Sequence, residues 1–457
     1  MPVILTQQIQ DTELAYGPNI LQCFNSSGGS NRIVAQLFDA TDDSLIADLR
    51  QLPNPSSYAF FDIQRILQAQ VAQSTTQGDT TGNTTYLFTN PAESFDYYVG
   101  VGTVSPSNVV TIDGYYSSSV VDNYLVIPGR KPATYPNGVV KWNDYGSYAP
   151  TISTFAGAND SAIVDRQQQA LTDNVYDTVL YGDITDGKPT DATFTANDIV
   201  YQIDVIRDTD HTLQFLQRWI DGSTGGGAPS YYNGINYIRF VVYDGNTLIS
   251  DSTLNNTISQ GGGPNSTPTS QVVPQGQYNI LGVKSGYNNS LLTTNATHMY
   301  VFVECQASDA FTADDGSKIS AFYRINVDEG ECNDFDLVQV KWLNSVGGTD
   351  YFTFQKRNDE NIRIKRDTYV KTNQDWLGTS WSNYSYDRGE TVYNQSAEVN
   401  YVANTRYLSD DESQYLKNLY LSPDVKVKFG TTGNWESAIL TSNRWTEKTY
   451  RKDKMFQ

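Results

Sequence analysis

Two histidines, His211 and His298, are the side chains best suited to proton transfer near neutral pH. They fall in separate predicted strands, and neither has a cysteine or a serine elbow close by in the sequence. A lone histidine in a strand is more often a packed or surface residue than a catalytic base. The sequence also lacks the GxSxG, HExxH and EF-hand patterns that assemble nucleophiles or metal ligands. We therefore predict a protein that is not an enzyme and needs no cofactor.

An acidic loop is the best candidate for cation binding. Asp309, Asp314 and Asp315 precede Gly316 in ASDAFTADDGSK, and carboxylates on a tight turn suit Ca²⁺. The spacing is irregular, so an ordinary acidic hairpin turn is favoured over a calcium site. The sequence also does not decide whether two carboxylates form a site for glycoside hydrolysis, because the fold sets the distance between them. No particular pair is indicated.

A C-terminal stretch combines positive charge with aromatic rings. Its basic residues are typical of a solvent-exposed strand edge, where charge prevents other strands from pairing with the sheet. The alternative is contact with an acidic neighbouring subunit. Its rings, in DWLGTSWSNYSYDRG, favour core or interface packing, with stacking on a sugar as the alternative. The candidate interface comprises Lys356, Arg357, Arg363, Lys365, Arg366, Trp376, Trp381, Tyr384 and Tyr386.

The net charge of −20, from 31 Lys and Arg against 51 Asp and Glu, argues against nucleic acid as a partner, because phosphates would be repelled. The glycine-rich stretches 222–230 and 259–270 lack a phosphate-binding pattern and indicate surface loops. No run approaches the ~20 apolar residues of a membrane span. The start, MPVILTQQIQDTE, lacks the features of a signal peptide, so we expect a reducing compartment.

The three cysteines, Cys23, Cys305 and Cys332, have neither CxxC nor metal-ligand spacing. Because a reducing compartment disfavours disulfides, we interpret the three cysteines as free thiols that pack among other side chains. Cys305 and Cys332 would pair only if their strands were neighbours, and the sequence does not decide this.

A duplicated hairpin indicates the scaffold that positions these residues. RIVAQLFDATDDSLIAD (32–48) recurs in altered form as YIRFVVYDGNTLISD (237–251), with Phe38-Asp39 matching Tyr243-Asp244. DYYVGVGT and MYVFVECQ follow the two copies at similar distances. Each copy has the alternation of a β-hairpin, and abundant Tyr, Thr, Asn and Gly suit sheets and turns. The repeated use of one β-unit within the chain indicates a structural role for the protein.

The predicted fold is mainly β, with tandem β-sandwich domains, a few short helices and a C-terminal α+β domain. A helix after Asp62, the expected N-cap, should place Ile63, Ile66, Leu67 and Val71 on one face. A second helix is expected around Ser161–Leu171, a third after the Ser409–Glu412 capping box, and a polar strand at 446–457. The predicted domains are a first sandwich (1–127), a connector (128–195), a related second sandwich (196–332) and a C-terminal β-rich domain (333–457).

Segments at both ends of the chain resemble virion structural proteins of tailed bacteriophages. They include RQLPNPSSYAFFDIQRILQ near the start and KWLNSVGGTDYFTFQKR, IKRDTYVK and YDRGETVYN near the end. They continue through LSDDESQYLKNLYLSPDVKV and SNRWTEKTYRKDKMF. Together the segments cover roughly a third of the chain, in order, and they carry no catalytic residue.

The resemblance implies a tail, neck or baseplate component of the type found in phages of Bacteroidota, located in the virion and assembled in the host cytoplasm. The expected partners are copies of the chain in a symmetric ring and adjacent virion proteins, without nucleic acid or membrane. Closed rings arise from heterologous contacts, to which an acidic body and the basic segment 356–371 would contribute. The alternative is a receptor- or glycan-binding module on the tail or head surface, with a host glycan as ligand.

Overall fold

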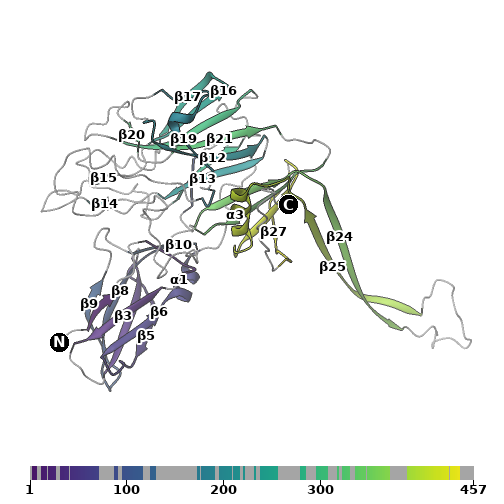
Figure 1. Ribbon diagram of the computed structural model, residues 1–457. Helices are drawn as coiled ribbons and strands as arrows, with labels where there is room; N and C mark the ends of the chain where they lie inside the picture. Colours follow the sequence, from purple (N-terminus) through teal and green to yellow (C-terminus); the bar gives the residue numbers. More distant parts are fainter. Residues whose placement is uncertain are drawn as a thin grey trace, which may run out of the picture.

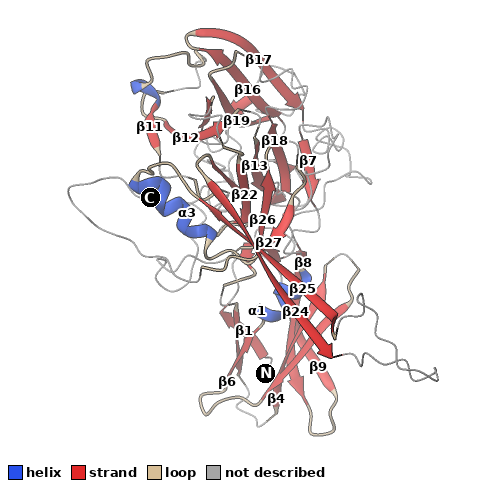
Figure 2. Cartoon of the chain, turned by 90° about the vertical axis from the view of Figure 1, so that its right-hand side faces the viewer, coloured by secondary structure: helices blue, strands red, loops and turns tan. Residues whose placement is uncertain are grey.

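The computed structural model is mainly β and consists of tandem β-sandwiches followed by a C-terminal α+β domain, as predicted (Figure 1). The two sandwiches lie at opposite ends of the body in two perpendicular views (Figures 1 and 2). The described residues are 3–7, 12–17, 19–26, 31–40, 42–71, 87–90, 95–116, 124–129, 172–174, 177–190, 195–207, 209–216, 220–221, 231–232, 237–255, 278–284, 295–306, 316–318, 322–329, 335–345, 347–370, 389–431 and 433–442.

The first sandwich packs a long sheet on a short one. The long sheet has the order β2-β10-β8-β4-β5, with β9 paired to β8. Its strands are β2 (Thr12–Leu14), β4 (Arg32–Asp39), β5 (Leu45–Gln51), β8 (Phe95–Val104), β9 (Val110–Tyr116) and β10 (Tyr124–Ile127). The short sheet has the order β1-β3-β6, formed by β1 (Val3–Gln7), β3 (Ile20–Asn25) and β6 (Tyr58–Asp62).

Alternate residues of both sheets build the core of this sandwich. Ile33, Ala35 and Leu37 of β4 point inward and pack in one cluster with Leu21 and Phe61 of the short sheet. This inward–outward alternation is the strand period that the sequence shows. This core uses one face of the long sheet, whereas Phe38 lies on the other face and is only partly buried.

Helix α1 (Gln64–Gln70) carries the predicted apolar face, with Leu67 fully buried. The expected N-cap was wrong by one residue, since Ile63 occupies that position. The backbone N–H of Ile63 still donates to the carbonyl of Asn19, 2.9 Å away, so the helix begins later than predicted. The carboxylate of Asp62 nevertheless accepts from the backbone N–H of Gln64 at 3.0 Å.

The second sandwich has a long sheet of order β11-β12-β21-β19-β16-β17, with β20 paired to β19. These strands are β11 (Thr178–Leu180), β12 (Ile199–Ile206), β16 (Tyr237–Asp244), β17 (Thr247–Asn255), β19 (His298–Gln306), β20 (Gly316–Lys318) and β21 (Phe322–Asp328). The facing sheet has the order β13-β18-β7, with β13 (Asp210–Leu216), β18 (Tyr278–Lys284) and β7 (Leu87–Asn90). A small pair, β14 (Ile220–Asp221) and β15 (Tyr231–Tyr232), and the short 3₁₀ helix η4 (Tyr181–Asp183) accompany them.

The two sandwiches repeat one topology. The hairpin β4–β5 corresponds to β16–β17, β8 to β19, β10 to β21 and β2 to β12, and the last two pair in parallel in both copies. Antiparallel β3–β6 likewise corresponds to β13–β18. Each hairpin carries a bulge at the same place, next to Phe38 in one copy and Tyr243 in the other. The arrangement is an immunoglobulin-type Greek key, with strands B and E in one sheet and G, F, C and C′ in the other.

Strand β7 links the two sandwiches. It lies in sequence between β6 and β8 of the first sandwich, yet pairs with β18 of the second, where Leu87 faces Leu281 and Asn90 faces Tyr278. The first sandwich therefore donates a strand to the second. Because backbone hydrogen bonds cross between them, the two units are joined by a sheet as well as by the chain.

The C-terminal domain is a four-stranded sheet covered by a helix. Its order is β23-β22-β26-β27, formed by β22 (Val338–Leu343), β23 (Thr349–Phe354), β26 (Val425–Phe429) and β27 (Glu436–Ala438). Helix α3 (Asp410–Leu419) packs on one face, where Trp342, Tyr415 and Leu419 share a core. The predicted capping box is confirmed: Ser409 Oγ accepts from the N–H of Glu412, and the Glu412 carboxylate accepts from the N–H of Ser409.

A long two-stranded arm extends from this domain. Among the described strands, β24 (Asn358–Val370) and β25 (Glu390–Ala403) pair only with each other, and they run away from the body on the side opposite the first sandwich (Figure 1). The helix expected around Ser161–Leu171 and the strand expected at 446–457 lie outside the described residues. Strand β11 falls within the stretch 128–195 that was assigned to a connector, and joins the second long sheet. In the described parts of the chain, no helix has the length and apolarity that a membrane crossing requires.

Candidate interaction surface

The arm is held together by cross-strand pairing rather than by a core. Its register runs from Asn358 opposite Ala403 to Val370 opposite Glu390, with one bulge after Asp367. Nearly every residue in both strands is exposed. An isolated two-stranded ribbon is marginally stable in water. An arm of this length is therefore expected to gain stability from a surface that covers it.

One face of the arm is apolar. Ile362 lies opposite Val399 and Ile364 opposite Ala397, and strand alternation places all four on the same face. At the base this face packs on the C-terminal sheet, where the rings of Tyr401 and Phe429 are 4.4 Å apart. Farther out it leaves the body, and Ile362 is 58% exposed. The aromatic contact at the base thus continues outward as an exposed apolar strip.

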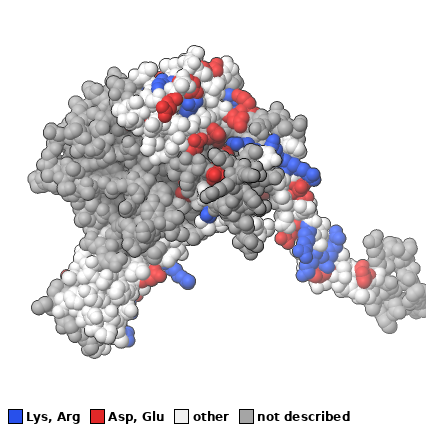
Figure 3. All heavy atoms as spheres, viewed as in Figure 1, with Lys and Arg blue, Asp and Glu red and all other residues white. Residues whose placement is uncertain are grey.

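The basic residues predicted as an interface lie in this arm and at its base. Arg363, Lys365 and Arg366 are exposed on β24, and Figure 3 shows Lys and Arg atoms gathered on the middle of the arm. Arg363 and Lys365 occupy the face opposite the apolar strip, with Arg363 across from Glu398. Arg366 is on the apolar side, next to Gln395. The middle of the arm therefore combines apolar contact area with three positive charges, while the two strands as a whole carry five carboxylates.

The remaining predicted interface residues are placed as follows. Lys356 and Arg357 lie at the base of the arm, and the Arg357 guanidinium is 2.9 Å from the Asp359 carboxylate. The aromatic candidates lie outside the described residues: Trp376, Trp381, Tyr384 and Tyr386. Sequence reasoning identified the charges but missed the arm. The sequence signal for the arm was a run, flanked by polar residues, in which Ile362 and Ile364 alternate with charged residues.

The junction between the second sandwich and the C-terminal sheet is unusually polar for a buried contact. Lys428 Nζ lies 3.1 Å from the Asp210 carboxylate, and the indole N–H of Trp435 donates to the same carboxylate oxygen. The side-chain amide oxygen of Gln339 accepts from the backbone N–H of Asp210 at 2.9 Å. Buried charges that pair and satisfy hydrogen bonds fix geometry more than they add stability. These contacts set the direction in which the arm-bearing domain points.

Lys341 is fully buried in the same junction, with its Nζ 4.6 Å from the centre of the Trp435 ring. Burial, reinforced by the neighbouring charges of Lys426 and Lys428, lowers the pKa of Lys341 to about 6. The sequence gives little sign of this, because alternating lysines in VKW and VKVKF read as solvent-facing positions. The contact with β13 across the other face of the sheet covers them.

Two buried carboxylates anchor the segment that precedes the second sandwich. Asp350 accepts hydrogen bonds from Thr172 Oγ1 and from the backbone N–H of Asp173. Asp173 accepts from Ser345 through both its hydroxyl and its backbone N–H. Burial and the neighbouring Asp173 raise the pKa of Asp350 to about 8, so the pair retains a proton near neutrality. Their hydrogen bonds serve to hold residues 172–173 against β22 and β23.

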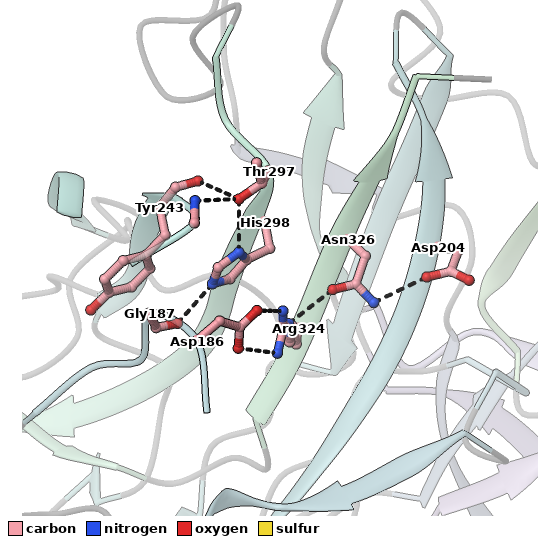
Figure 4. A network of polar contacts seen from close by, with 9 residues as sticks. Asp186, Gly187, Asp204, Tyr243, Thr297, His298, Arg324 and Asn326 are labelled. Carbon is pink, nitrogen blue, oxygen red and sulfur yellow. Dashed lines mark hydrogen bonds and ion pairs between the residues drawn. The ribbon is translucent and has the colours of Figure 1, made fainter. Parts of the chain in front are cut away.

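His298 belongs to a polar network that fastens residues 181–189 over the outer face of the second long sheet (Figure 4). Its Nε2 is 2.7 Å from the Gly187 carbonyl oxygen, which can only accept, so this nitrogen carries the proton. Its Nδ1 is 3.0 Å from Thr297 Oγ1. Burial lowers the pKa of His298, which favours the neutral ring. Both ring nitrogens are used in holding this segment.

A second part of the network joins the same segment to β21. Asp186 forms a two-pronged ion pair with Arg324, whose Nε donates to Asn326, which in turn donates to Asp204 (Figure 4). The Arg324 guanidinium also lies 5.8 Å from the centre of the Tyr300 ring. Beneath this network Tyr181 and Ile184 pack with Tyr243 and Tyr300 in one core. The covering segment is therefore bound by charge, hydrogen bonds and aromatic contact together.

The remaining candidates for chemistry are placed as follows. His211 is buried against the Tyr351 ring, and burial lowers its pKa to about 4. Within the residues that the structure describes, no group of three or more His, Cys, Asp or Glu side chains is arranged to hold a metal ion. Asp309, Asp314, Asp315 and Cys332 lie outside those residues. Cys23 is a buried thiol whose pKa burial raises to about 12.

Comparisons with known proteins leave the family open. No protein-family model matches the chain, and no curated protein matches it. Among solved structures, a chain from "Crystal structure of Dpr2 Ig1-Ig2 in complex with DIP-Theta Ig1-Ig3" is 10% identical, covering 72% of this chain and 99% of its own length. Its TM-score is 0.13, so the tandem-sandwich architecture stands on the strand order described above.

Proposed function

We propose that the protein is a non-enzymatic structural subunit of a phage virion that assembles with copies of itself through the β24–β25 arm, as a ring in the tail, neck or baseplate. The observation that carries the proposal is the arm itself, whose paired strands expose an apolar strip beyond the body. Monomeric soluble proteins rarely keep such a surface uncovered. A neighbouring subunit is the natural cover in a scaffold protein.

The body supports this role by being braced at its junctions. Strand β7 crosses from one sandwich to the other, and the Lys428–Asp210 pair joins the C-terminal domain to the second. Such bracing fixes the direction of the arm relative to the body. The arm of one subunit would bind a different surface on the next subunit, which is a heterologous contact. Repeated contacts of this kind form a closed ring when the rotation from one subunit to the next divides a full turn.

The virion location depends on the resemblance of the end segments. KWLNSVGGTDYFTFQKR spans β22 and β23, IKRDTYVK lies in β24, and LSDDESQYLKNLYLSPDVKV covers α3 and the start of β26. The segments that resemble virion proteins therefore include parts of the arm and of the domain that carries it. This coincidence supports an arm that serves assembly.

Mass photometry of the purified chain over a dilution series tests the assembly. We expect a discrete oligomer that dissociates on dilution, and a variant in which residues 358–403 are replaced by a short glycine-serine linker should stay monomeric. A far-ultraviolet circular dichroism spectrum of that variant checks that the rest of the β-structure persists. A full-length chain that is monomeric at every concentration would contradict the proposal.

The glycan-binding alternative has its own test. Its proposed aromatic residues, Trp376 to Tyr386, lie outside the described residues. Glycan-array binding by the full chain, lost on replacing Trp376 and Trp381 by alanine while the oligomer persists, would favour that alternative over a purely structural role.

A further inference from the structure

The internal duplication identifies two equivalent places on the outer faces of the long sheets. Phe38 pairs across the strands with Tyr98 in the first sandwich, and Tyr243 pairs with His298 in the second. Both pairs follow the shared bulge, and both stack ring on ring, with centroids 5.0 Å and 5.3 Å apart. These residues occupy the same position in the two copies of the fold.

In the second sandwich this position is covered by the chain itself. Residues 181–189 lie over the pair, and Tyr243 and His298 are only 6% and 2% exposed. The approach is so close that a Cβ on Gly187 would lie 2.4 Å from a ring carbon of Tyr243. On the same face Arg324 lies over the ring of Tyr300. The covering therefore combines close backbone contact with a cation placed on an aromatic ring.

In the first sandwich no segment that the structure describes covers the equivalent position in this way. Tyr115 adds a third ring to Phe38 and Tyr98, with centroids 5.9 Å and 6.0 Å away, and is 64% exposed. We call Phe38, Tyr98 and Tyr115 the aromatic platform. Gly100 leaves room for these rings, because a Cβ there would lie 3.1 Å from Tyr115 and 3.2 Å from Phe38.

The rim of the platform is acidic. Asp42 and Asp43 are exposed in the turn after β4, and the Tyr98 hydroxyl donates to the Asp43 carboxylate at 3.1 Å. A partner that covers the platform must therefore present positive charge and tolerate aromatic contact. Arginine satisfies both requirements, since its planar guanidinium stacks on rings and pairs with carboxylates.

We propose that the aromatic platform receives the basic part of the β24–β25 arm from a second copy of the chain. The acidic rim attracts positive charge, and Arg363, Lys365 and Arg366 stand exposed on the arm. Arg366 lies on the same face of β24 as Ile362 and Ile364, so this one face offers a guanidinium to the acidic rim and apolar contact to the rings. The arm and the first sandwich of the same chain lie on different sides of the body (Figure 1), so the contact joins two copies.

This inference rests on the proposed self-assembly and adds the receiving surface to it. A photo-crosslinking amino acid at position 115 tests it, with position 407 as the control, because Tyr115 and Tyr407 are 64% and 63% exposed. On illumination of the assembled protein, we expect crosslinked dimers whose peptides, identified by mass spectrometry, join residue 115 to residues 358–370. Position 407 should give no such peptide.

A substitution gives an independent readout. Tyr115→Ala should raise the concentration at which half the chains are assembled by about tenfold, the effect of losing an aromatic interface residue. Tyr407→Ala should leave that concentration unchanged. Assembly that forms normally with Tyr115→Ala, or crosslinks from position 115 that reach other regions, would overturn the inference and leave self-assembly standing. A chain that is monomeric throughout would overturn both.

Discussion

Lys428 and Asp210 form an ion pair that joins the arm-bearing domain to the second sandwich, with 3.1 Å between Nζ and Oδ2. Their side chains are 4% and 9% exposed, so water does little to screen them. The pair bridges β26 and β13, which are far apart in the sequence. It is one of the contacts that join the arm-bearing domain to the body, beside the hydrogen bonds from Asp210 N–H to Gln339 and from Thr212 to Tyr351.

Asp210→Asn should destabilise the protein strongly. The substitution leaves the Lys428 ammonium buried beside a neutral amide, and removing one partner of a buried pair costs about 3–5 kcal/mol. Urea unfolding of the full chain measures the loss. The matched control is Asp359→Asn, which breaks the exposed pair with Arg357 and should cost less than about 1 kcal/mol. Equal effects of the two substitutions would show that the buried pair does not brace the junction.

Gly187→Ala should detach the covering segment from the second sandwich. The added Cβ would meet the Tyr243 ring at 2.4 Å and the Gly245 carbonyl at 2.5 Å, and the latter is backbone that cannot rotate aside. Overpacking of this kind typically costs about 1–3 kcal/mol. Uncovering His298 should also let its pKa rise toward the ordinary value, as followed by NMR titration.

Gly114→Ala is the control for that substitution, because the nearest atoms to its Cβ, on Tyr116, are at ordinary contact distances from 3.4 Å. It should leave both stability and the His298 titration near those of the parent protein. An unchanged His298 titration in Gly187→Ala would contradict the assigned role of residues 181–189.

Lys341→Met should stabilise the protein most at low pH. The folded-state pKa of Lys341 is depressed to about 6 from an ordinary value of 10.5, so between these values the unfolded chain binds a proton that the folded chain does not. Stability of the parent protein therefore rises with pH across that window through this group. The advantage of the variant should shrink from about pH 6 upward, by about 1.4 kcal/mol per pH unit. A pH-independent difference between the two proteins would show that Lys341 stays charged when folded.

Local features were predictable from the sequence, whereas contacts between distant segments were not. The Ser409 capping box and the hairpins at 32–48 and 237–251 depend on neighbours in the chain, and they were found from spacing alone. The pairing of β7 with β18 of the second sandwich was not predicted, because the residue pattern of β7 would fit the edge of any sheet. The burial of Lys341 likewise depends on β13 covering a face that the sequence marks as polar.

The candidate interface was predictable as a charged run but not as an arm. Arg363 and Lys365 alternate with Ile362 and Ile364, a pattern that indicates a strand with one polar and one apolar face. The pattern does not show whether such a strand joins a sheet or leaves the body. In the structure β24 joins neither edge of the C-terminal sheet, whose order is β23-β22-β26-β27.

Hydrogen exchange should separate the arm from the rest of the molecule. In the monomer, the amides of β24 and β25 should exchange faster than those of β22, because an isolated ribbon opens easily while β22 is buried on both faces. In the assembled protein, the arm should become protected. Hydrogen exchange followed by mass spectrometry, at protein concentrations above and below the one at which the oligomer dissociates, measures the change. Slow exchange of the arm amides in the monomer would show that the arm is stable without a neighbouring subunit.

Cryo-electron microscopy of the assembled protein tests the central claim most directly. We predict a closed ring in which β24 of each subunit contacts Phe38, Tyr98 and Tyr115 of the next. Particles in which the arms point into solvent, or a chain that forms no particles, would contradict the account.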